Sequence, residues 1–377
     1  MIKDMHIKFQ TTGHDEFIDF IKSYAILCVI FGHTFPMLDK IGYGIWAGMQ
    51  VPLFILIQTF HYLKKERSFK INVGKILGRV AVPFIIAEIL TFIVAMFIKG
   101  ESTSTLIQEF IQKGGYGPGS YYPYIYLQIT LLLPFFAILL KHFNKHQLSA
   151  ISYQLSAVSY QRSAISGQKS ESKSESESAV GVNSQSQSQS LLIVFLLLSE
   201  GFEILFSLTD FPDTIYRILA IRYIFLIYLG WLWVKDGVVI NKTTILLSVL
   251  SLCAIIYFEY GPIDNEPWFY STGWKFHRWP CYFFVANGFI AILHYVWKYL
   301  KNNKFIVNAV KTIASATYEI YLIQMSVIYL FTTKSITFTS NIMLRYIIWL
   351  VIIWTISVGG GILINKIINK ANDKNNR

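Results

Sequence analysis

Apolar residues are grouped along the chain in long runs, which short polar or basic stretches separate. A helix of roughly 20 apolar residues crosses the hydrocarbon core of a bilayer, and most of the runs have about that length. The pattern therefore predicts an all-α, polytopic membrane bundle. Its ten transmembrane helices are expected at approximately 17–38, 43–63, 79–98, 121–140, 191–208, 217–234, 243–260, 277–297, 306–331 and 342–364.

The charge of the polar stretches alternates along the chain. Cytoplasmic loops of membrane proteins carry an excess of Lys and Arg. The stretches after the even-numbered runs are basic, whereas intervening stretches such as 209–214 and 261–268 are acidic or polar. We therefore expect both termini in the cytoplasm. The basic residues concerned are Lys64, Lys65, Arg67, Lys70, Lys75, Lys141, Lys145, Lys235, Lys242, Lys298, Lys301, Lys304, Lys366, Lys370, Lys374 and Arg377.

Composition supports the membrane class, because 54% of the residues are hydrophobic and only 15% are charged. A soluble protein has about 45–50% apolar and about 25% charged residues. The net charge of +11 lies in the loops and indicates orientation in the membrane rather than nucleic-acid binding. Cys28, Cys253 and Cys281 lie in apolar runs without metal-ligand spacing, which is typical of packing residues. We expect no metal site and no bound cofactor.

The stretch 149–190 has a different composition from the rest of the chain. It begins with a seven-residue repeat and continues into Ser-, Gln- and Glu-rich sequence. Such low-complexity sequence buries too little apolar surface to offset the entropy of ordering. We expect a disordered cytoplasmic insertion there. It would divide one membrane domain into helices 1–4, within 1–148, and helices 5–10, within 191–377.

Two ionisable residues in the first predicted helix stand out. Ionisable side chains inside a bilayer are costly and mark functional candidates. Lys22 and His33 are eleven residues apart, so both lie on nearly the same helix face, with about 16 Å between them along the axis. Histidine is suited to general-base catalysis near neutral pH. The alternative is that His33 is a packing residue hydrogen-bonded to a neighbouring helix.

Several stretches resemble membrane-bound acyltransferase family 3, bacterial enzymes that modify surface and secreted glycans. The first helix has a basic residue, ten residues and then histidine, as the family does. The other similar stretches, in chain order, are VPLFILIQTFHYLKKERSF (51–69), KILGRVAVPF (75–84), GPGSYYPYIYLQITLLLPFF (117–136) and IASATYEIYLIQMSVIYL (313–330).

The resemblance implies roles for particular residues. His33 would be the catalytic histidine and Lys22 its paired basic residue. Arg79 and Lys75 would join Lys22 in a basic mouth that binds the phosphates of coenzyme A, although a positively charged anchor for lipid headgroups also explains Arg79. Tyr318 and Glu319 are candidates for lining the substrate path.

The sequence departs from the family pattern at four places. The stretch 75–84 resembles a family motif of two arginines three residues apart followed by a proline, and Ile76 takes the place of the first arginine. Gln58 and its two successors replace Ser-Gly-Phe, Thr317 replaces serine, and Gln324 replaces a late histidine. Since Lys22 and His33 remain, the changes indicate a divergent branch rather than an inactive enzyme.

Other polar and aromatic residues have simpler interpretations. The tyrosines at 116, 121, 122, 124 and 126 fit an aromatic belt at the membrane interface, and 114–120 has the glycines of a loop rather than of a strand-to-helix phosphate motif. Glu88 lies nine residues after Arg79, on the opposite face of the same helix. Arg222 is too far inside its span to reach the interface easily, and Glu203 is also placed inside a span.

The sequence therefore predicts a multi-pass protein of the bacterial cytoplasmic membrane. The resemblance implies transfer of an acyl group, most simply acetyl, from acetyl-coenzyme A to a hydroxyl of a surface glycan or a lipid-linked sugar. Membrane lipid surrounds the bundle. A transporter or flippase of a lipid-linked sugar is one alternative, and a non-catalytic relative of the family is another.

Overall fold

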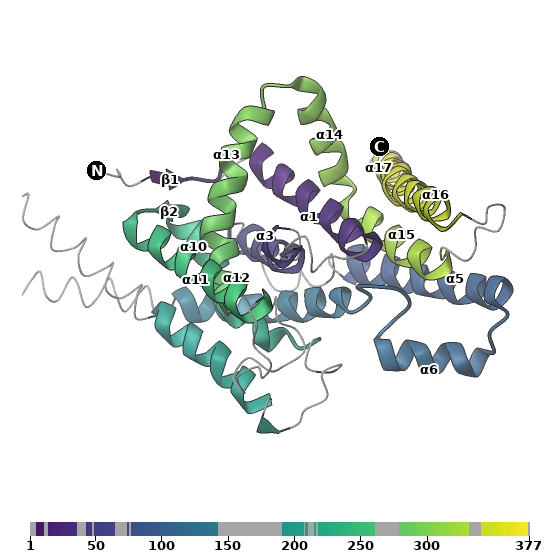
Figure 1. The fold of residues 1–377 in the computed structure, drawn as a ribbon, viewed down its shortest axis with the longest axis horizontal. Helices are drawn as coiled ribbons and strands as arrows, with labels where there is room; N and C mark the ends of the chain where they lie inside the picture. The colour runs from purple at the N-terminus through teal and green to yellow at the C-terminus, as the bar shows by residue number, and fades with distance from the viewer. Residues whose placement is uncertain are drawn as a thin grey trace, which may run out of the picture.

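The computed structural model describes residues 5–10, 14–35, 43–46, 49–64, 74, 77–141, 191–206, 208–209, 215, 218–260, 279–331 and 341–375 (Figure 1). Helices dominate them. In chain order they are α1 (Glu16–Thr34), α2 (Tyr43–Trp46), α3 (Gln50–Lys64), α5 (Val82–Lys99), α6 (Thr103–Lys113), the helix Tyr122–Lys141, a helix over 191–206, α10 (Ile224–Lys235), α11 (Lys242–Tyr260), α12 (Trp279–Phe284), α13 (Ile290–Leu300), α14 (Lys304–Ser315), α15 (Thr317–Leu330), α16 (Ile342–Trp354) and α17 (Gly360–Asn375).

Short irregular turns extend several of these helices. A π-helical turn, Leu77–Ala81, precedes α5, and a 3₁₀ turn, Ala220–Tyr223, precedes α10. Two further π-helical turns, Val285–Phe289 and Thr355–Gly359, join α12 to α13 and α16 to α17. Single π-helical turns within α-helices are frequently located at functional sites.

The predicted all-α, membrane-like fold is confirmed. Each of the ten predicted segments is mainly helical in its described part. Among the described residues, five helices are long and apolar enough to cross a membrane: Glu16–Thr34, Leu77–Ile98, Tyr122–Lys141, Pro280–Leu300 and Ile342–Lys370. The number of ten spans and the orientation of the termini stay predictions.

Three local features differ from the sequence prediction. The predicted helix over 306–331 is not continuous, because α14 and α15 meet at an angle of 70°. The connection after α5 contains α6, which the side chain of Ser102 caps by accepting a hydrogen bond from the Thr105 N–H. The N-terminal segment forms a strand, β1 (Met5–Ile7), which pairs antiparallel with β2 (Val238–Ile240).

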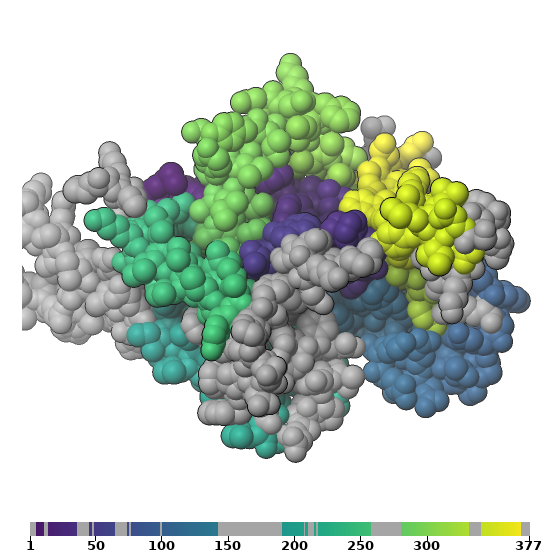
Figure 2. Space-filling model, viewed as in Figure 1, coloured from purple at the N-terminus to yellow at the C-terminus, as the bar shows by residue number. Residues whose placement is uncertain are grey.

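The first transmembrane helix, α1, lies in the middle of the bundle (Figure 1). It packs against α3, α13, α14 and α15, and in the space-filling view it is visible only in part between its neighbours (Figure 2). The Asp15 side chain caps its first turn by accepting hydrogen bonds from the N–H groups of Phe17 and Ile18. Because α1 carries both Lys22 and His33, the two candidate residues are held in the most enclosed part of the fold.

The helix α5 has the opposite character and presents apolar side chains outward. Ile85, Ile89 and Phe97 are 53%, 53% and 84% exposed. Exposed aliphatic and aromatic side chains in this number are stable only where lipid covers them. We therefore interpret this face of α5 as lipid-facing.

Candidate active site

An internal cavity of about 630 Å³ lies where α1, α3, the helix Tyr122–Lys141, α15 and the turn before α5 meet. This volume falls within the range of small-molecule binding sites. Four of the residues predicted from the sequence line it together, although the chain separates them by up to about 300 positions: Lys22, Arg79, Tyr318 and Glu319.

Lys22 enters the cavity from α1 with a carboxylate beside it. Its Nζ lies 3.8 Å from Oδ1 of Asp19, one helical turn earlier, and His14 lies 2.5 Å from the other oxygen of Asp19. The side chain of Lys22 is 27% exposed, so its charge reaches the cavity. On the other side of this helix, the hydroxyl of Ser23 donates to the carbonyl of Val310 at 2.8 Å and fixes α1 against α14.

Arg79 and the two candidates on α15 meet at the turn Leu77–Ala81. Arg79 is exposed, and it lies on that turn at the margin of the cavity. The hydroxyl of Tyr318 donates to the carbonyl of Val80 at 2.6 Å, which joins α15 to the turn that carries Arg79. Glu319 is half-buried at the same margin.

His33 lies outside this cavity, at the last turn of α1, beside the loop 114–120. A Cβ placed on Gly119 would lie 3.8 Å from Nε2 of His33 and 3.4 Å from the hydroxyl of Tyr321. The Tyr321 hydroxyl also donates a hydrogen bond to the Gly119 carbonyl, and its ring lines the cavity. Tyr321 therefore connects the cavity that contains Lys22 with the imidazole of His33. No residue in the described part of the chain hydrogen bonds to that imidazole.

The loop 114–120 is held from three sides. The Tyr116 N–H donates to Oε2 of Glu88 on α5 at 2.8 Å, and the Tyr116 hydroxyl donates to the Leu106 carbonyl on α6 at 3.0 Å. Gly117 has a φ of +86°, and a Cβ there would lie 2.2 Å from the carbonyl oxygen of Met325. Only glycine fits such an approach of the loop to α15.

One prediction about this region is wrong. The belt interpretation fails for Tyr116, Tyr121 and Tyr122, because all three are buried among protein side chains. The segment 114–120 is a loop, as predicted, and it packs against α5, α6 and α15 and places Gly119 at His33.

Three polar residues of the site were not among the predicted site residues, namely Asp19 and two residues of α3. Gln58 and His61 both line the cavity, and the Gln58 amide donates to the Tyr126 carbonyl and the Thr130 hydroxyl at 2.9 and 2.8 Å. Gln58 and His61 are three residues apart, which places both on one face of a transmembrane helix, and this spacing could have identified them from the sequence. The same spacing joins Asp19 to Lys22.

The remaining candidates have other surroundings. Arg222 and Glu203 form a fully buried ion pair, with 3.3 Å between Nε and Oε1, so each balances the charge of the other. Lys75 and Ile76 lie outside the described residues, as does the predicted insertion 149–190. Gln324 is completely buried on α15, one turn after Tyr321.

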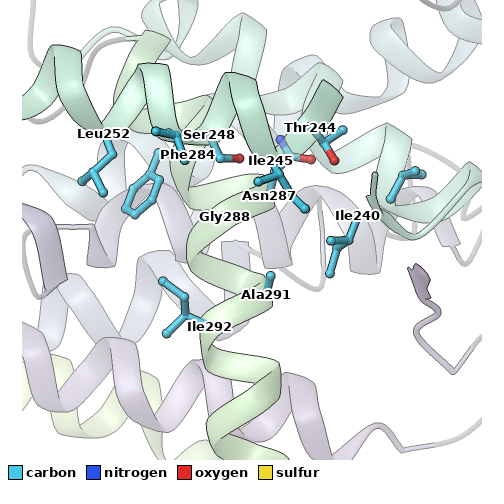
Figure 3. A pocket seen from close by; sticks show the side chains of 12 residues that line it. Ile240, Thr244, Ile245, Ser248, Leu252, Phe284, Asn287, Gly288, Ala291 and Ile292 are labelled. Carbon is cyan, nitrogen blue, oxygen red and sulfur yellow. The ribbon is translucent and has the colours of Figure 1, made fainter. Parts of the chain in front are cut away.

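A smaller cavity of about 250 Å³ lies between α11 and the segment from α12 to α13 (Figure 3). Its lining is apolar except for Thr244, Ser248 and Asn287, and it contains none of the residues predicted for the site. Within the described ranges, His, Cys, Asp and Glu side chains form no group of three that suits a metal ion.

The long apolar helices, and a cavity between them with Lys22 and Arg79 in its lining, indicate a multi-pass membrane protein. The model of acyltransferase family 3, described as an acyltransferase domain, matches residues 15–170. The match over these residues confirms the resemblance seen in the sequence. No curated protein and no solved structure matches the chain significantly.

Proposed function

We propose that the protein is an O-acetyltransferase of the bacterial cytoplasmic membrane. It would transfer an acetyl group from acetyl-coenzyme A to a hydroxyl group of a surface or exported glycan. The observation that supports this proposal most strongly is the cavity that gathers Lys22, Arg79, Tyr318 and Glu319 and that Tyr321 links to His33.

The charges of the cavity suit an anionic donor. Lys22 and Arg79 offer two cationic groups at one margin, and charge-assisted hydrogen bonds to phosphate are among the strongest in proteins. Coenzyme A carries its phosphates at the end remote from the thioester. With the phosphates at Lys22 and Arg79, the thioester points along the cavity toward Tyr321 and His33.

The reaction converts the thioester of the donor into an oxygen ester of the acceptor. The acceptor hydroxyl attacks the thioester carbonyl carbon, His33 takes the hydroxyl proton, the C–S bond breaks, and the thiolate of coenzyme A receives a proton. The products are the acetyl ester and the free thiol. A water-poor cavity would limit hydrolysis of the thioester.

The proposal includes ten spans with both termini in the cytoplasm. Strand β1 pairs with β2, which follows α10, and the Lys64 ammonium at the end of α3 donates to the Gln10 carbonyl. The N-terminal segment therefore meets the ends of the second and the sixth predicted spans. Glu16 pairs with Lys311 on α14 at 2.7 Å. These contacts support one common face for the basic loops, as the positive-inside rule requires.

The experiment that tests the function uses membranes with equal amounts of the wild-type chain or of His33→Ala. Radiolabelled acetyl-coenzyme A is supplied with a glycan extract of the host, and the label in the polysaccharide and lipid fractions is counted. We expect label only with the wild-type chain. Equal label in both membranes would contradict a catalytic His33, and absence of label in both would contradict the acetyltransferase function.

One observation favours transport of a lipid-linked sugar as a second candidate. The pair α14 and α15 is bent by 70°, and broken helices at mid-membrane are common in transporters. A flippase would move a fluorescent lipid-linked sugar across vesicle membranes without acetyl-coenzyme A. The non-catalytic alternative predicts that His33→Ala restores the phenotype of a deletion strain.

A further inference from the structure

A separate groove of about 340 Å³ lies on the lipid-facing side of the bundle, between α5, α6 and the helix Tyr122–Lys141. Ile85 and Ile89 form part of its wall, and both are also among the outward-facing residues of α5. A groove that opens on this face of a transmembrane helix is reached from the hydrocarbon of the bilayer rather than from water.

The groove is connected to the site by the loop 114–120. Tyr116 lines the groove, and three residues later Gly119 lies beside Nε2 of His33. Glu88 also lines the groove and accepts the hydrogen bond of the Tyr116 N–H. A molecule seated along α5 therefore has its end next to the segment that contacts His33.

The chemistry of the lining restricts the occupant. The described lining contains no Lys or Arg, so nothing there balances a phosphate. Glu88 is 5% exposed, one of its oxygens accepts from Tyr116, and Oε1 has no hydrogen-bond partner among the described residues. A buried oxygen without a partner favours a ligand that donates a hydrogen bond, such as a hydroxyl group.

We propose that this groove binds the hydrocarbon chain of the acceptor, a neutral glycolipid, with a sugar hydroxyl near Glu88 and a second sugar hydroxyl presented to His33. The inference rests on the proposed acetyl transfer and deepens it, because it makes the acceptor a membrane lipid rather than a free polysaccharide. Donor and acceptor then use different cavities, which meet at Gly119 and Tyr321.

The test uses the full-length protein in phospholipid vesicles without acetyl-coenzyme A. Two photoreactive diazirine lipids with identical acyl chains are compared, a monoglucosyl diacylglycerol and a phosphatidylglycerol. The glucosyl lipid is expected to label peptides from α5 and from 114–127, and excess unlabelled glucosyl lipid is expected to compete.

The variant Ile89→Trp fills the groove, whereas Ile86→Trp adds the same bulk to a lipid-facing residue of α5 outside it. We expect labelling to fall at least about tenfold in Ile89→Trp, which corresponds to ~1.4 kcal/mol of binding free energy, and to stay unchanged in Ile86→Trp. Equal labelling by both lipids, or equal labelling of both variants, would overturn the proposal, because the groove would then hold ordinary bilayer lipid.

The design separates this inference from the proposed function. Binding of the glucosyl lipid is measured without the donor, so it does not depend on acetyl transfer. Specific labelling without any transfer of acetyl groups would support the groove and contradict the enzyme. Acetyl transfer that proceeds equally in wild type and Ile89→Trp would support the enzyme and overturn the groove.

Discussion

The Tyr321 hydroxyl donates a hydrogen bond to the carbonyl of Gly119, the residue that lies beside the imidazole of His33. The contact joins α15 to the loop 114–120 across 202 positions of the chain. Tyr321 faces the cavity of Lys22 and Arg79, while Gly119 faces the end of α1. The contact therefore lies between the cavity that Lys22 and Arg79 line and the imidazole of His33.

Replacement of Gly119 by alanine is expected to reduce activity. Gly119 has a φ of +90°, which an L-residue adopts only at a cost of about 1–3 kcal/mol, and relaxation of this strain would shift the loop relative to His33. We expect kcat to fall at least about tenfold, equivalent to ~1.4 kcal/mol in the barrier. Acetyl transfer in membranes measures the change.

Gly100→Ala provides the matched control for this variant. Gly100 also has a positive φ, of +64°, but a Cβ there would have no atom within 4 Å. Strain alone would lower stability in both variants and leave kcat of Gly100→Ala unchanged. Equal losses of kcat in the two variants would contradict a special role for Gly119.

Removal of either cation from the cavity is expected to weaken donor binding. We expect Lys22→Ala and Arg79→Ala each to raise the KM for acetyl-coenzyme A about tenfold or more, because a hydrogen bond to a charged group contributes about 1.5–3 kcal/mol. Lys311→Ala is the control, since Lys311 pairs with Glu16 and does not line the cavity. A similar rise in Lys311→Ala would indicate a general effect of surface charge.

Glu88 is expected to act as a positioning residue through Tyr116. Glu88→Gln keeps an oxygen that accepts the Tyr116 N–H, whereas Glu88→Ala leaves that buried N–H without its partner, at a cost of about 1–3 kcal/mol. Compared with the Gln variant, the Ala variant is expected to show a clear further loss of kcat, with little change in donor KM. Equal activity of both variants would show that the loop needs no anchor on α5.

How far the sequence predicts the fold depends on the kind of feature. The helices follow from run length, because the thickness of the bilayer fixes the length of a span. The bend between α14 and α15 does not, since it accompanies packing of α14 against α1 through Ser23 and Val310. The β1–β2 pairing likewise joins two short segments, with the partners Met5 and Ile240 lying 235 positions apart, and no local sequence pattern predicts this contact.

For the site, the sequence identified four residues that line the cavity but not their neighbours, such as Asp19 and His61. Lys22, Arg79, Tyr318 and Glu319 do line one cavity. Gly119 could not be foreseen, because glycine in a connection usually indicates only a turn, and its approach to His33 arises from tertiary packing.

The buried ion pair of Arg222 and Glu203 is expected to stabilise the bundle rather than to take part in catalysis. Glu203→Gln removes one charge of a pair that is fully buried, and breaking such a pair typically costs about 3–5 kcal/mol. We expect a large fall in the temperature at which the detergent-solubilised protein aggregates, with unchanged donor KM in the remaining folded protein. Loss of activity at full thermal stability would contradict this structural role.

Deletion of 150–189 is expected to leave activity intact. Low-complexity Ser- and Gln-rich sequence contributes little to a packed core, and the cavity is lined by residues from other parts of the chain. Acetyl transfer by the shortened protein, normalised to its amount in membranes, measures the effect. Complete loss in a well-expressed protein would show that the segment has a function.

The family-matched region and α15 supply different parts of the candidate site. Residues 15–170 contain Lys22, His33, Arg79 and Gly119, whereas Tyr318, Glu319 and Tyr321 lie on α15, well beyond them. During synthesis the N-terminal helices enter the membrane long before α15 does. A half-made chain therefore carries Lys22, His33 and Arg79 but lacks one wall of the cavity, so the cavity is complete only when translation is nearly finished.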